Sequence, residues 1–116
     1  MKIYGIKNCS TVKKALDWFG RNNIEYEFHD FKKLGISEIK LEEWSSKLGW
    51  EPLVNKRGTT WKQLGPEIQR RVNSKQEAFK LMQEKTSVIK RPVIETDKDI
   101  LTGFDEAAYK KLFGLQ

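Results

Sequence analysis

The sequence predicts one α/β domain with a mixed sheet. At the amino-terminal end, a strand, a helix and a second strand follow one another within residues 2–31. At the carboxyl-terminal end, two short strands precede a helix within residues 91–113. The length of 116 residues suffices for one domain with a real core and is too short for two ordinary ones.

The amino-terminal unit begins with "KIYGI" at 2–6, a short run rich in β-formers that predicts a buried strand. A polar loop follows, and an amphipathic helix then closes near the "GRNN" stretch at 20–23. The apolar face of this helix consists of Val12, Ala15, Leu16 and Phe19. Apolar and polar side chains alternate over 24–31, which predicts a second strand. This order favours a parallel pair of strands with a right-handed crossover.

The middle of the chain, about residues 36–88, is predicted to be a mostly helical insertion. Ser37 can cap a helix that Gly49 is well placed to end. The segment 50–68 contains proline and glycine without a long period, so we expect turns and short helical pieces. Ser74 opens a further helix with a capping-box pattern.

The carboxyl-terminal unit contains two short apolar runs, 91–95 and 99–104, separated by polar residues, which predicts a hairpin. Asp105 can cap a last helix, with Phe104 and Tyr109 placed as a hydrophobic staple. Without the middle, the chain is βαβ plus ββα. This is the minimal arrangement of a thioredoxin-like domain, and residues 1–116 form a single such domain in this prediction.

The composition is that of a soluble globular protein, with 38% hydrophobic and 33% charged residues. No run of about 18 apolar residues could span a bilayer, and the apolar part of the amino terminus is too short for a secretory signal. One cysteine cannot form an internal disulfide, so no feature indicates an oxidising compartment. We therefore expect a cytoplasmic location and no membrane association.

The net charge of +6 is compatible with an anionic partner. The basic residues are spread along the chain, however, and the four tryptophans form no aromatic-basic repeat, so direct nucleic-acid binding is not expected. The sequence shows no glycine-rich phosphate loop, metal-ligand cluster or serine triad. We expect no metal and no bound cofactor.

The single cysteine, Cys9, stands two or three residues ahead of the first predicted helical turn. Free N–H groups and the positive dipole end favour an anion there, so the thiol pKa should be low and the thiolate nucleophilic. Lys7 and Lys13 add positive charge. The alternative, a buried structural cysteine, is disfavoured by its polar neighbours. Neighbours that could line an oxyanion site beside the sulfur are Asn8, Ser10 and Thr11.

A proline at the start of a strand, facing a reactive cysteine, shapes the substrate groove of thioredoxin-like domains. Pro92 has this place in the predicted topology, although a sequence by itself does not show whether its peptide bond is cis. Arg91 would then face Cys9 with a fork of donors that suits an oxyanion or a carboxylate; the alternative is an exposed arginine. Lys56 and Arg57 lie in a glycine-containing turn and form either a second anion clamp or an ordinary basic loop.

Four segments, "MKIYGIKNCSTVKKAL", "NKRGTTWKQLG", "IKRPVI" and "LTGFDEAAY", resemble the arsenate reductase (ArsC) family, most closely its YffB-like branch, with Spx regulators more distant. The resemblance covers essentially the whole chain. It implies a thioredoxin-like fold with a helical insertion, in which one cysteine attacks arsenate or a disulfide, and glutathione with glutaredoxin resolves the intermediate. Cys9 then matches the nucleophile, Arg91 the arginine before the strand proline, and Arg57 or Lys56 a further oxyanion-binding arginine.

Two departures from the family pattern affect the expected substrate. Gly103 stands where arsenate reductases have a third active-site arginine, and Gly5 stands near an upstream histidine of theirs. A site with fewer charges fits a glutathione-dependent thiol reductase better than a reductase of arsenate. In either case Val12 occupies the place of the second thiol of a Cys-x-x-Cys motif, so any disulfide formed in turnover must join Cys9 to an external thiol.

We therefore expect a monomeric thiol-based oxidoreductase. Its ligand would be a small oxyanion or a glutathione mixed disulfide, with glutathione as co-substrate and glutaredoxin as a further partner. The alternative is a regulator that resembles Spx and binds RNA polymerase. Val12 argues against that alternative, because the redox switch of Spx resembles Cys-x-x-Cys.

Overall fold

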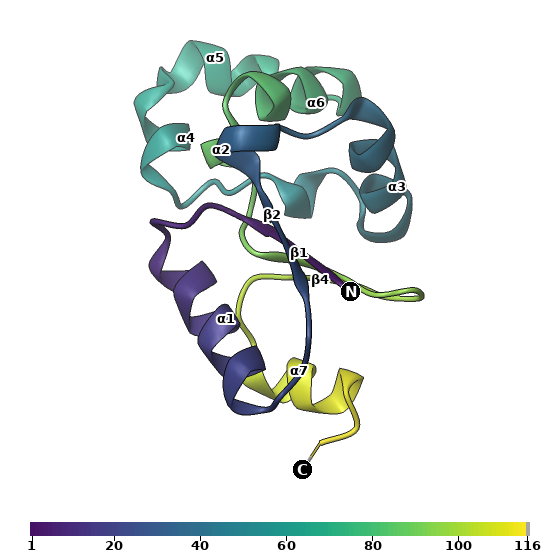
Figure 1. The fold of residues 1–116 in the computed structure, drawn as a ribbon. Helices are drawn as coiled ribbons and strands as arrows, with labels where there is room; N and C mark the ends of the chain where they lie inside the picture. Colours follow the sequence, from purple (N-terminus) through teal and green to yellow (C-terminus); the bar gives the residue numbers. More distant parts are fainter. Residues whose placement is uncertain (116) are drawn as a thin grey trace.

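A four-stranded mixed sheet separates two groups of helices in the computed structural model, which describes residues 1–115 (Figure 1). The strands are β1 (Lys2–Gly5), β2 (Glu27–Asp30), β3 (Val93–Glu95) and β4 (Ile100–Thr102). The α-helices are α1 (Ser10–Arg21), α2 (Phe31–Leu34), α3 (Glu38–Leu48), α4 (Thr59–Gln63), α5 (Gly65–Arg71), α6 (Lys75–Glu84) and α7 (Glu106–Leu112). Two 3₁₀ turns are η1 (Glu51–Leu53) and η2 (Thr86–Val88).

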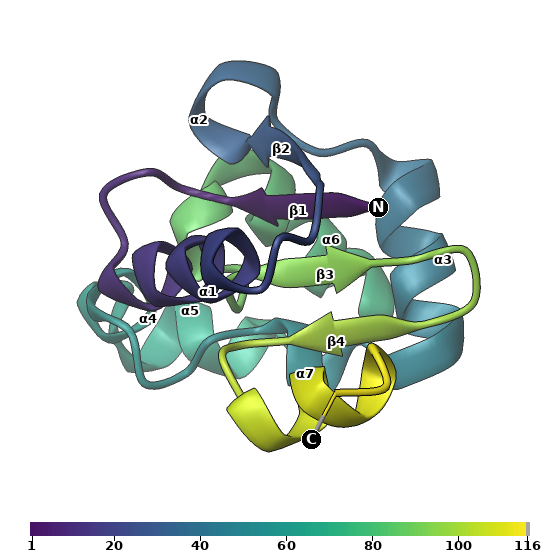
Figure 2. The same cartoon turned by 60° about the horizontal axis from the view of Figure 1, so that its bottom comes forward.

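The strand order is β2-β1-β3-β4, which Figure 2 shows face on. β1 pairs in parallel with β2 and antiparallel with β3, and β3 pairs antiparallel with β4. The register places Ile3 opposite both Phe28 and Ile94. This is the predicted α/β, thioredoxin-like combination of βαβ and ββα in one mixed sheet.

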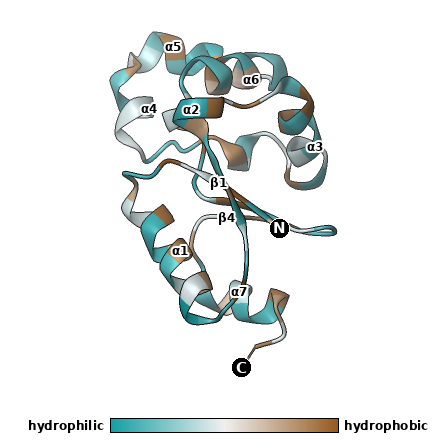
Figure 3. Ribbon diagram, viewed as in Figure 1, coloured by the Kyte–Doolittle hydropathy of each residue, from teal (hydrophilic) through white to brown (hydrophobic). Residues whose placement is uncertain are grey.

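The two faces of the sheet bury separate cores. α1 and α7 cover one face, and the helices α2 to α6 cover the other (Figure 1). Because side chains alternate along a strand, Ile3 and Ile94 enter the core under α1 and α7, whereas Tyr4 and Val93 enter the core under the helical middle. The helices show both brown and teal segments in Figure 3, as helices with one buried face do.

The core under α1 and α7 contains several aromatic rings. Trp18 and Phe19 of α1 pack against Tyr109 of α7, with ring centroids 5.3 Å apart in both pairs. The predicted staple also forms, since the rings of Phe104 and Tyr109 meet edge to face at 5.4 Å. These contacts hold α1 and α7 together on this face of the sheet.

A charged cluster ties α3 to the sheet on the other face. The Glu95 carboxylate accepts hydrogen bonds from the Tyr4 hydroxyl at 3.1 Å, the Trp44 indole at 2.9 Å and the Lys40 ammonium at 3.1 Å. Burial opposes ionisation of Glu95, but the bonds from these donors outweigh it and lower the pKa of the carboxyl group below its ordinary value. The cluster therefore stabilises the packing of α3 most when Glu95 is charged.

Local helix signals are confirmed at three predicted caps. Ser37 accepts a hydrogen bond from the Lys40 N–H, Ser74 from the Glu77 N–H, and Asp105 from the Ala108 N–H. The first helix ends at Arg21, as the "GRNN" stretch predicts.

The predicted strand 24–31 is too long at both ends. Its first residues are held by the end of α1, where the Ile24 N–H donates to the Phe19 carbonyl at 3.0 Å. At the other end, Asp30 caps a helical turn that Phe31 begins, so the helical segment starts before residue 36. Among residues 1–115, no helix is long and apolar enough to cross a membrane.

Candidate active site

Cys9 is the N-cap residue of α1, directly before its first helical residue, Ser10. This is closer to the helix than the sequence predicted. Its carbonyl accepts the first bond of the helix, from the Lys13 N–H at 3.0 Å, and its own N–H donates to the Ile6 carbonyl at 3.2 Å. The side chain is half-buried and the thiol is free. The backbone thus holds the sulfur at the amino-terminal end of the helix, which favours negative charge.

The surroundings of the sulfur lower the pKa of Cys9. Burial raises it, but the Val12 N–H, the Arg91 guanidinium and the Thr11 N–H together outweigh burial and bring the pKa below its ordinary value. Because these donors lower the pKa, they favour the thiolate, which is the nucleophilic form.

Backbone carbonyl groups hold the Arg91 side chain in place. Its Nη1 donates to the carbonyl oxygens of Ser87 and of Ile89, the latter at 3.0 Å. Its Nε is buried and has no hydrogen-bond partner among residues 1–115. One edge of the guanidinium is thus anchored to η2, while an N–H remains for the thiolate or for a ligand. The Arg91–Pro92 peptide bond is cis, which the sequence left undecided.

Cys9 and Arg91 open into one cavity of about 460 Å³. The cavity is lined by Cys9, Thr11, Asn55, Lys90, Arg91, Thr102, Gly103, Phe104 and Asp105. It lies where the loop before α1, the start of β3 and the end of β4 meet. Of the side chains predicted to bind an oxyanion, Arg91 and Thr11 line it. Asn8 and Ser10 are exposed and do not line it.

Lys56 and Arg57 lie outside the cavity that contains Cys9. They line a neighbouring pocket of about 390 Å³, whose lining residues are Pro52, Val54, Asn55, Lys56, Arg57 and Lys90. The Lys56 ammonium is 5.7 Å from the ring centroid of Trp61, so it also makes a cation–π contact. Pro92, the predicted groove-shaping residue, is buried, and its carbonyl accepts from the Gly103 N–H at 2.8 Å.

Sequence reasoning missed Asn55, Lys90, Thr102, Phe104 and Asp105 as cavity residues. Lys90 had a local signal, since it directly precedes Arg91. Asn55 had none, because its position depends on the course of a loop without periodic pattern. Gly58 gives Asn55 its space: a Cβ on Gly58 would lie 2.8 Å from Asn55 Nδ2.

The two glycines that depart from the family pattern are explained by the geometry. A Cβ on Gly5 would lie 2.9 Å from Val12 Cγ2, so a side chain there would push α1 away from β1. Gly103 has φ +77°, a conformation that disfavours residues with side chains. The structure therefore leaves no room for a histidine at Gly5 without a shift of α1.

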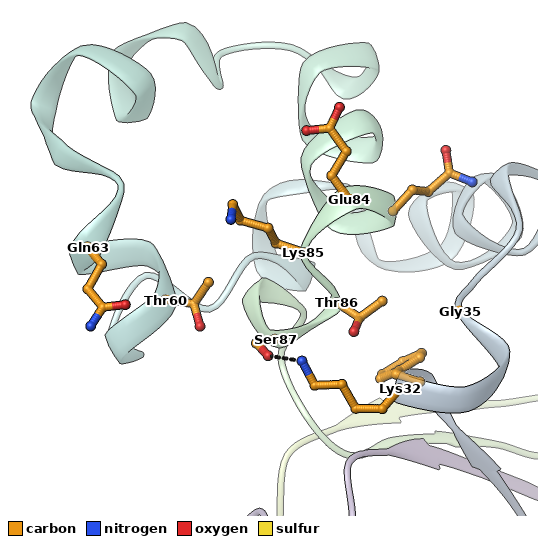
Figure 4. A pocket seen from close by; sticks show the side chains of 10 residues that line it. Lys32, Gly35, Thr60, Gln63, Glu84, Lys85, Thr86 and Ser87 are labelled. Atoms are coloured by element: carbon orange, nitrogen blue, oxygen red, sulfur yellow. Dashed lines mark hydrogen bonds between the residues drawn. The ribbon is translucent and has the colours of Figure 1, made fainter.

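A larger pocket of about 590 Å³ lies between α2, α4 and the end of α6 (Figure 4). Lys32 Nζ donates to Ser87 Oγ at its edge, at 2.9 Å. It shares no lining residue with the cavity at Cys9. Residues 1–115 contain no group of three or more side chains that could hold a metal ion.

The sequence and the fold of this chain are similar to those of known proteins. The model of the ArsC family matches residues 4–112. An uncharacterized protein of Haemophilus influenzae is 41% identical over 111 residues, which is 96% of each chain. The solved structure titled YFFB (PA3664) protein superposes with a TM-score of 0.89 at 37% identity, covering 95% of this chain and 96% of that one.

A solved arsenate reductase (ArsC) related protein from Brucella melitensis is 40% identical, with a TM-score of 0.76 and coverage of 98% and 94%. The similarity extends at lower identity to regulators. The global transcriptional regulator Spx of Lactiplantibacillus plantarum is 24% identical over 106 residues, which are 90% of this chain and 79% of Spx.

Proposed function

This chain belongs to the ArsC family, and on that premise we propose that it is a thiol-based oxidoreductase whose single nucleophile, Cys9, is restored by an external thiol such as glutathione. The observation that carries the proposal is the N-cap position of Cys9, with a lowered pKa, beside Arg91 in an open cavity. Membership of the ArsC family supports thiol redox chemistry in general. The substrate and the reductant are the proposed part.

The first step is attack by the Cys9 thiolate on one sulfur of a disulfide R–S–S–R′. A bond forms between Cys9 Sγ and the sulfur of R, the S–S bond of the substrate breaks, and R′S⁻ leaves and takes a proton from water. The Val12 N–H and Arg91 stabilise the thiolate before attack. The cavity is wide enough at about 460 Å³ to admit a peptide-sized thiol.

In the second step a glutathione thiolate attacks the mixed disulfide at the sulfur of R. Cys9 leaves as thiolate, and R–S–S–glutathione is released, to be reduced by further glutathione or by glutaredoxin. Val12 occupies the position that a resolving cysteine would need, so the second thiol must come from outside. Over both steps the substrate disulfide is exchanged and Cys9 is regenerated.

Arsenate is the competing substrate. A compact oxyanion bound at Cys9 would contact Arg91, but the predicted partners Lys56 and Arg57 line the neighbouring pocket. Two pockets side by side fit an extended ligand better than one tetrahedral ion. We therefore place disulfides ahead of arsenate as substrates.

The test measures glutathione-dependent reduction of a small mixed disulfide, and separately of arsenate, by the wild type and by Cys9→Ser. The wild type is expected to turn over the disulfide, and Cys9→Ser is expected to lose this activity, because serine is not a nucleophile for sulfur at neutral pH. Equal urea denaturation of the two proteins is the control for folding. Full activity in Cys9→Ser would refute the proposal, and faster turnover of arsenate would reverse the order of substrates.

A second candidate is regulation of transcription through RNA polymerase, which the similarity to Spx favours. Capture of polymerase subunits by the tagged protein, unchanged in Cys9→Ser and without any turnover of disulfide or arsenate by the wild type, would support it. The absence of a second thiol at Val12 argues against a redox switch of the Cys-x-x-Cys kind.

A further inference from the structure

Asn55 and Lys90 line both the cavity at Cys9 and the neighbouring pocket of Lys56 and Arg57. The two cavities are therefore adjacent, and these two residues stand where they meet. Of the two, Lys90 is the charged one. The resemblance to the ArsC family assigns no role to Lys90, although it lies within the segment "IKRPVI".

Two backbone hydrogen bonds join the segment of Lys90 to the segment of Asn55. The Lys90 N–H donates to the Leu53 carbonyl at 2.8 Å, and nearby the Asn55 N–H donates to the Val88 carbonyl at 2.7 Å. The side chain, in contrast, is exposed, and within residues 1–115 its ammonium makes no hydrogen bond or salt bridge. Lys90 therefore combines a fixed position with a charge that is free for a ligand.

The Lys90 side chain extends beside Gly103. Lys90 Cε lies 3.6 Å from the position that a Cβ on Gly103 would take. The aliphatic chain thus passes over the bare backbone at the end of β4, beside the cavity that contains Cys9. The one carboxylate lining this cavity, Asp105, already accepts the Ala108 N–H through its Oδ1. Lys90 and Arg91 leave the cavity with a positive balance.

We propose that Lys90 determines substrate specificity by binding a carboxylate of an anionic thiol or disulfide whose sulfur reacts at Cys9. This inference rests on the proposed thiol chemistry of Cys9. The Lys90 ammonium binds the carboxylate of the ligand at a distance from the reacting sulfur. Arg91 and the first turn of α1 act on the Cys9 sulfur itself. Lys90 is accordingly a residue that discriminates between disulfides and leaves the intrinsic reactivity of the thiolate unchanged.

The test uses two aromatic disulfides. One, 5,5′-dithiobis(2-nitrobenzoate), carries two carboxylates, and the other, 4,4′-dithiodipyridine, is neutral at pH 7. In each case the Cys9 thiolate attacks one sulfur, a Cys9 mixed disulfide forms, and one aromatic thiolate leaves and is counted by its absorbance. The second-order rate constant is measured for the wild type, Lys90→Gln, Lys90→Arg and the control Lys80→Gln. Lys80 is an exposed lysine of α6 that lines neither cavity.

Lys90→Gln is expected to slow the anionic probe about threefold to fivefold, as for loss of one exposed charge pair. It should leave the rate with the neutral probe unchanged. Lys90→Arg should restore the rate with the anionic probe, and Lys80→Gln should alter neither rate. High salt should remove the difference between wild type and Lys90→Gln, because salt screens exposed charges.

Three results would overturn the inference. Equal slowing of both probes in Lys90→Gln would mean that Lys90 acts on the thiol or on the fold. An unchanged rate with the anionic probe in Lys90→Gln would mean that Lys90 does not bind the carboxylate of the ligand. Equal slowing of the anionic probe in Lys80→Gln would assign the effect to net charge. A wild type in which Cys9 reacts with neither probe would instead refute the proposed function itself.

Discussion

The close approach of β1 to α1 at Gly5 predicts the effect of one added methyl group. Gly5 ends β1 and is buried, and Val12 in the first turn of α1 is fully buried against it. A Cβ on Gly5 would lie 2.9 Å from Val12 Cγ2 and 3.2 Å from Val12 Cγ1. Because the Val12 N–H also lowers the pKa of Cys9, Gly5→Ala should disturb both stability and reactivity.

The expected magnitudes follow from packing. Gly5→Ala overfills the contact and should lower the free energy of unfolding by about 2 kcal/mol. Val12→Ala removes two buried methyl groups and should cost about 2 kcal/mol. In the double variant the new methyl enters the space that valine vacated. The free energy of unfolding of the double variant should therefore fall by about 2 to 3 kcal/mol. Independent effects would add to about 4 kcal/mol.

Urea denaturation of the four proteins gives this double-mutant cycle, and the rate of Cys9 alkylation at fixed pH reports the position of the helix donors. Gly5→Ala should also slow alkylation, since displaced N–H groups stabilise the thiolate less. The matched control is Gly20→Ala, an exposed position of α1 with no neighbouring atom within 4 Å of the added Cβ; it should be neutral or stabilising by up to about 1 kcal/mol. Additive losses in the double variant, or a harmless Gly5→Ala, would refute the reasoning.

Two further predictions concern charge. The pH dependence of Cys9 alkylation should have its midpoint below the ordinary pKa of a free cysteine, and Arg91→Met should move that midpoint upward, since Arg91 is one of the groups that lower the pKa; an unchanged midpoint would contradict the role of Arg91. Glu95→Gln should lower the free energy of unfolding by about 2 kcal/mol at pH 7, because the carboxylate accepts from Tyr4, Trp44 and Lys40. Since folding lowers the pKa of Glu95, this stabilisation is present above the unfolded pKa of about 4.3 and is lost as pH falls through the folded pKa, so the difference from wild type should shrink in acid. A difference that stays constant down to pH 2 would contradict this assignment.

The order of the elements was predictable because its signals are local. A cap is made within three residues, so the serine and aspartate caps Ser37, Ser74 and Asp105 could be identified without any tertiary information. The limits of the second strand were not predictable in the same way. Its alternation continues through Ile24, but that residue is bonded to the end of α1. A hydrogen bond to the helix end, which sequence alternation does not reveal, decides where the strand begins.

The roles of the site residues stay predictions, but their positions were partly foreseen. Cys9 and Arg91 were expected to face each other because a strand-start proline faces the reactive cysteine in thioredoxin-like domains, and both line one cavity. Lys56 and Arg57 were expected beside them and lie in the next pocket. The loop that carries them has no period, so its course could not be derived.

The sequence by itself predicted the order of the strands and of most helices, and it placed the thiol near the start of α1. Each of these depends on residues within a few positions of one another or on the residue types alone. Only the tertiary structure decided which cations share a cavity with Cys9, since residues far apart along the chain meet there. Lys90 and Asn55 belong to the site because two backbone hydrogen bonds join the segments 53–55 and 88–90. Such long-range pairing follows from how the whole core packs, which no short stretch of sequence encodes.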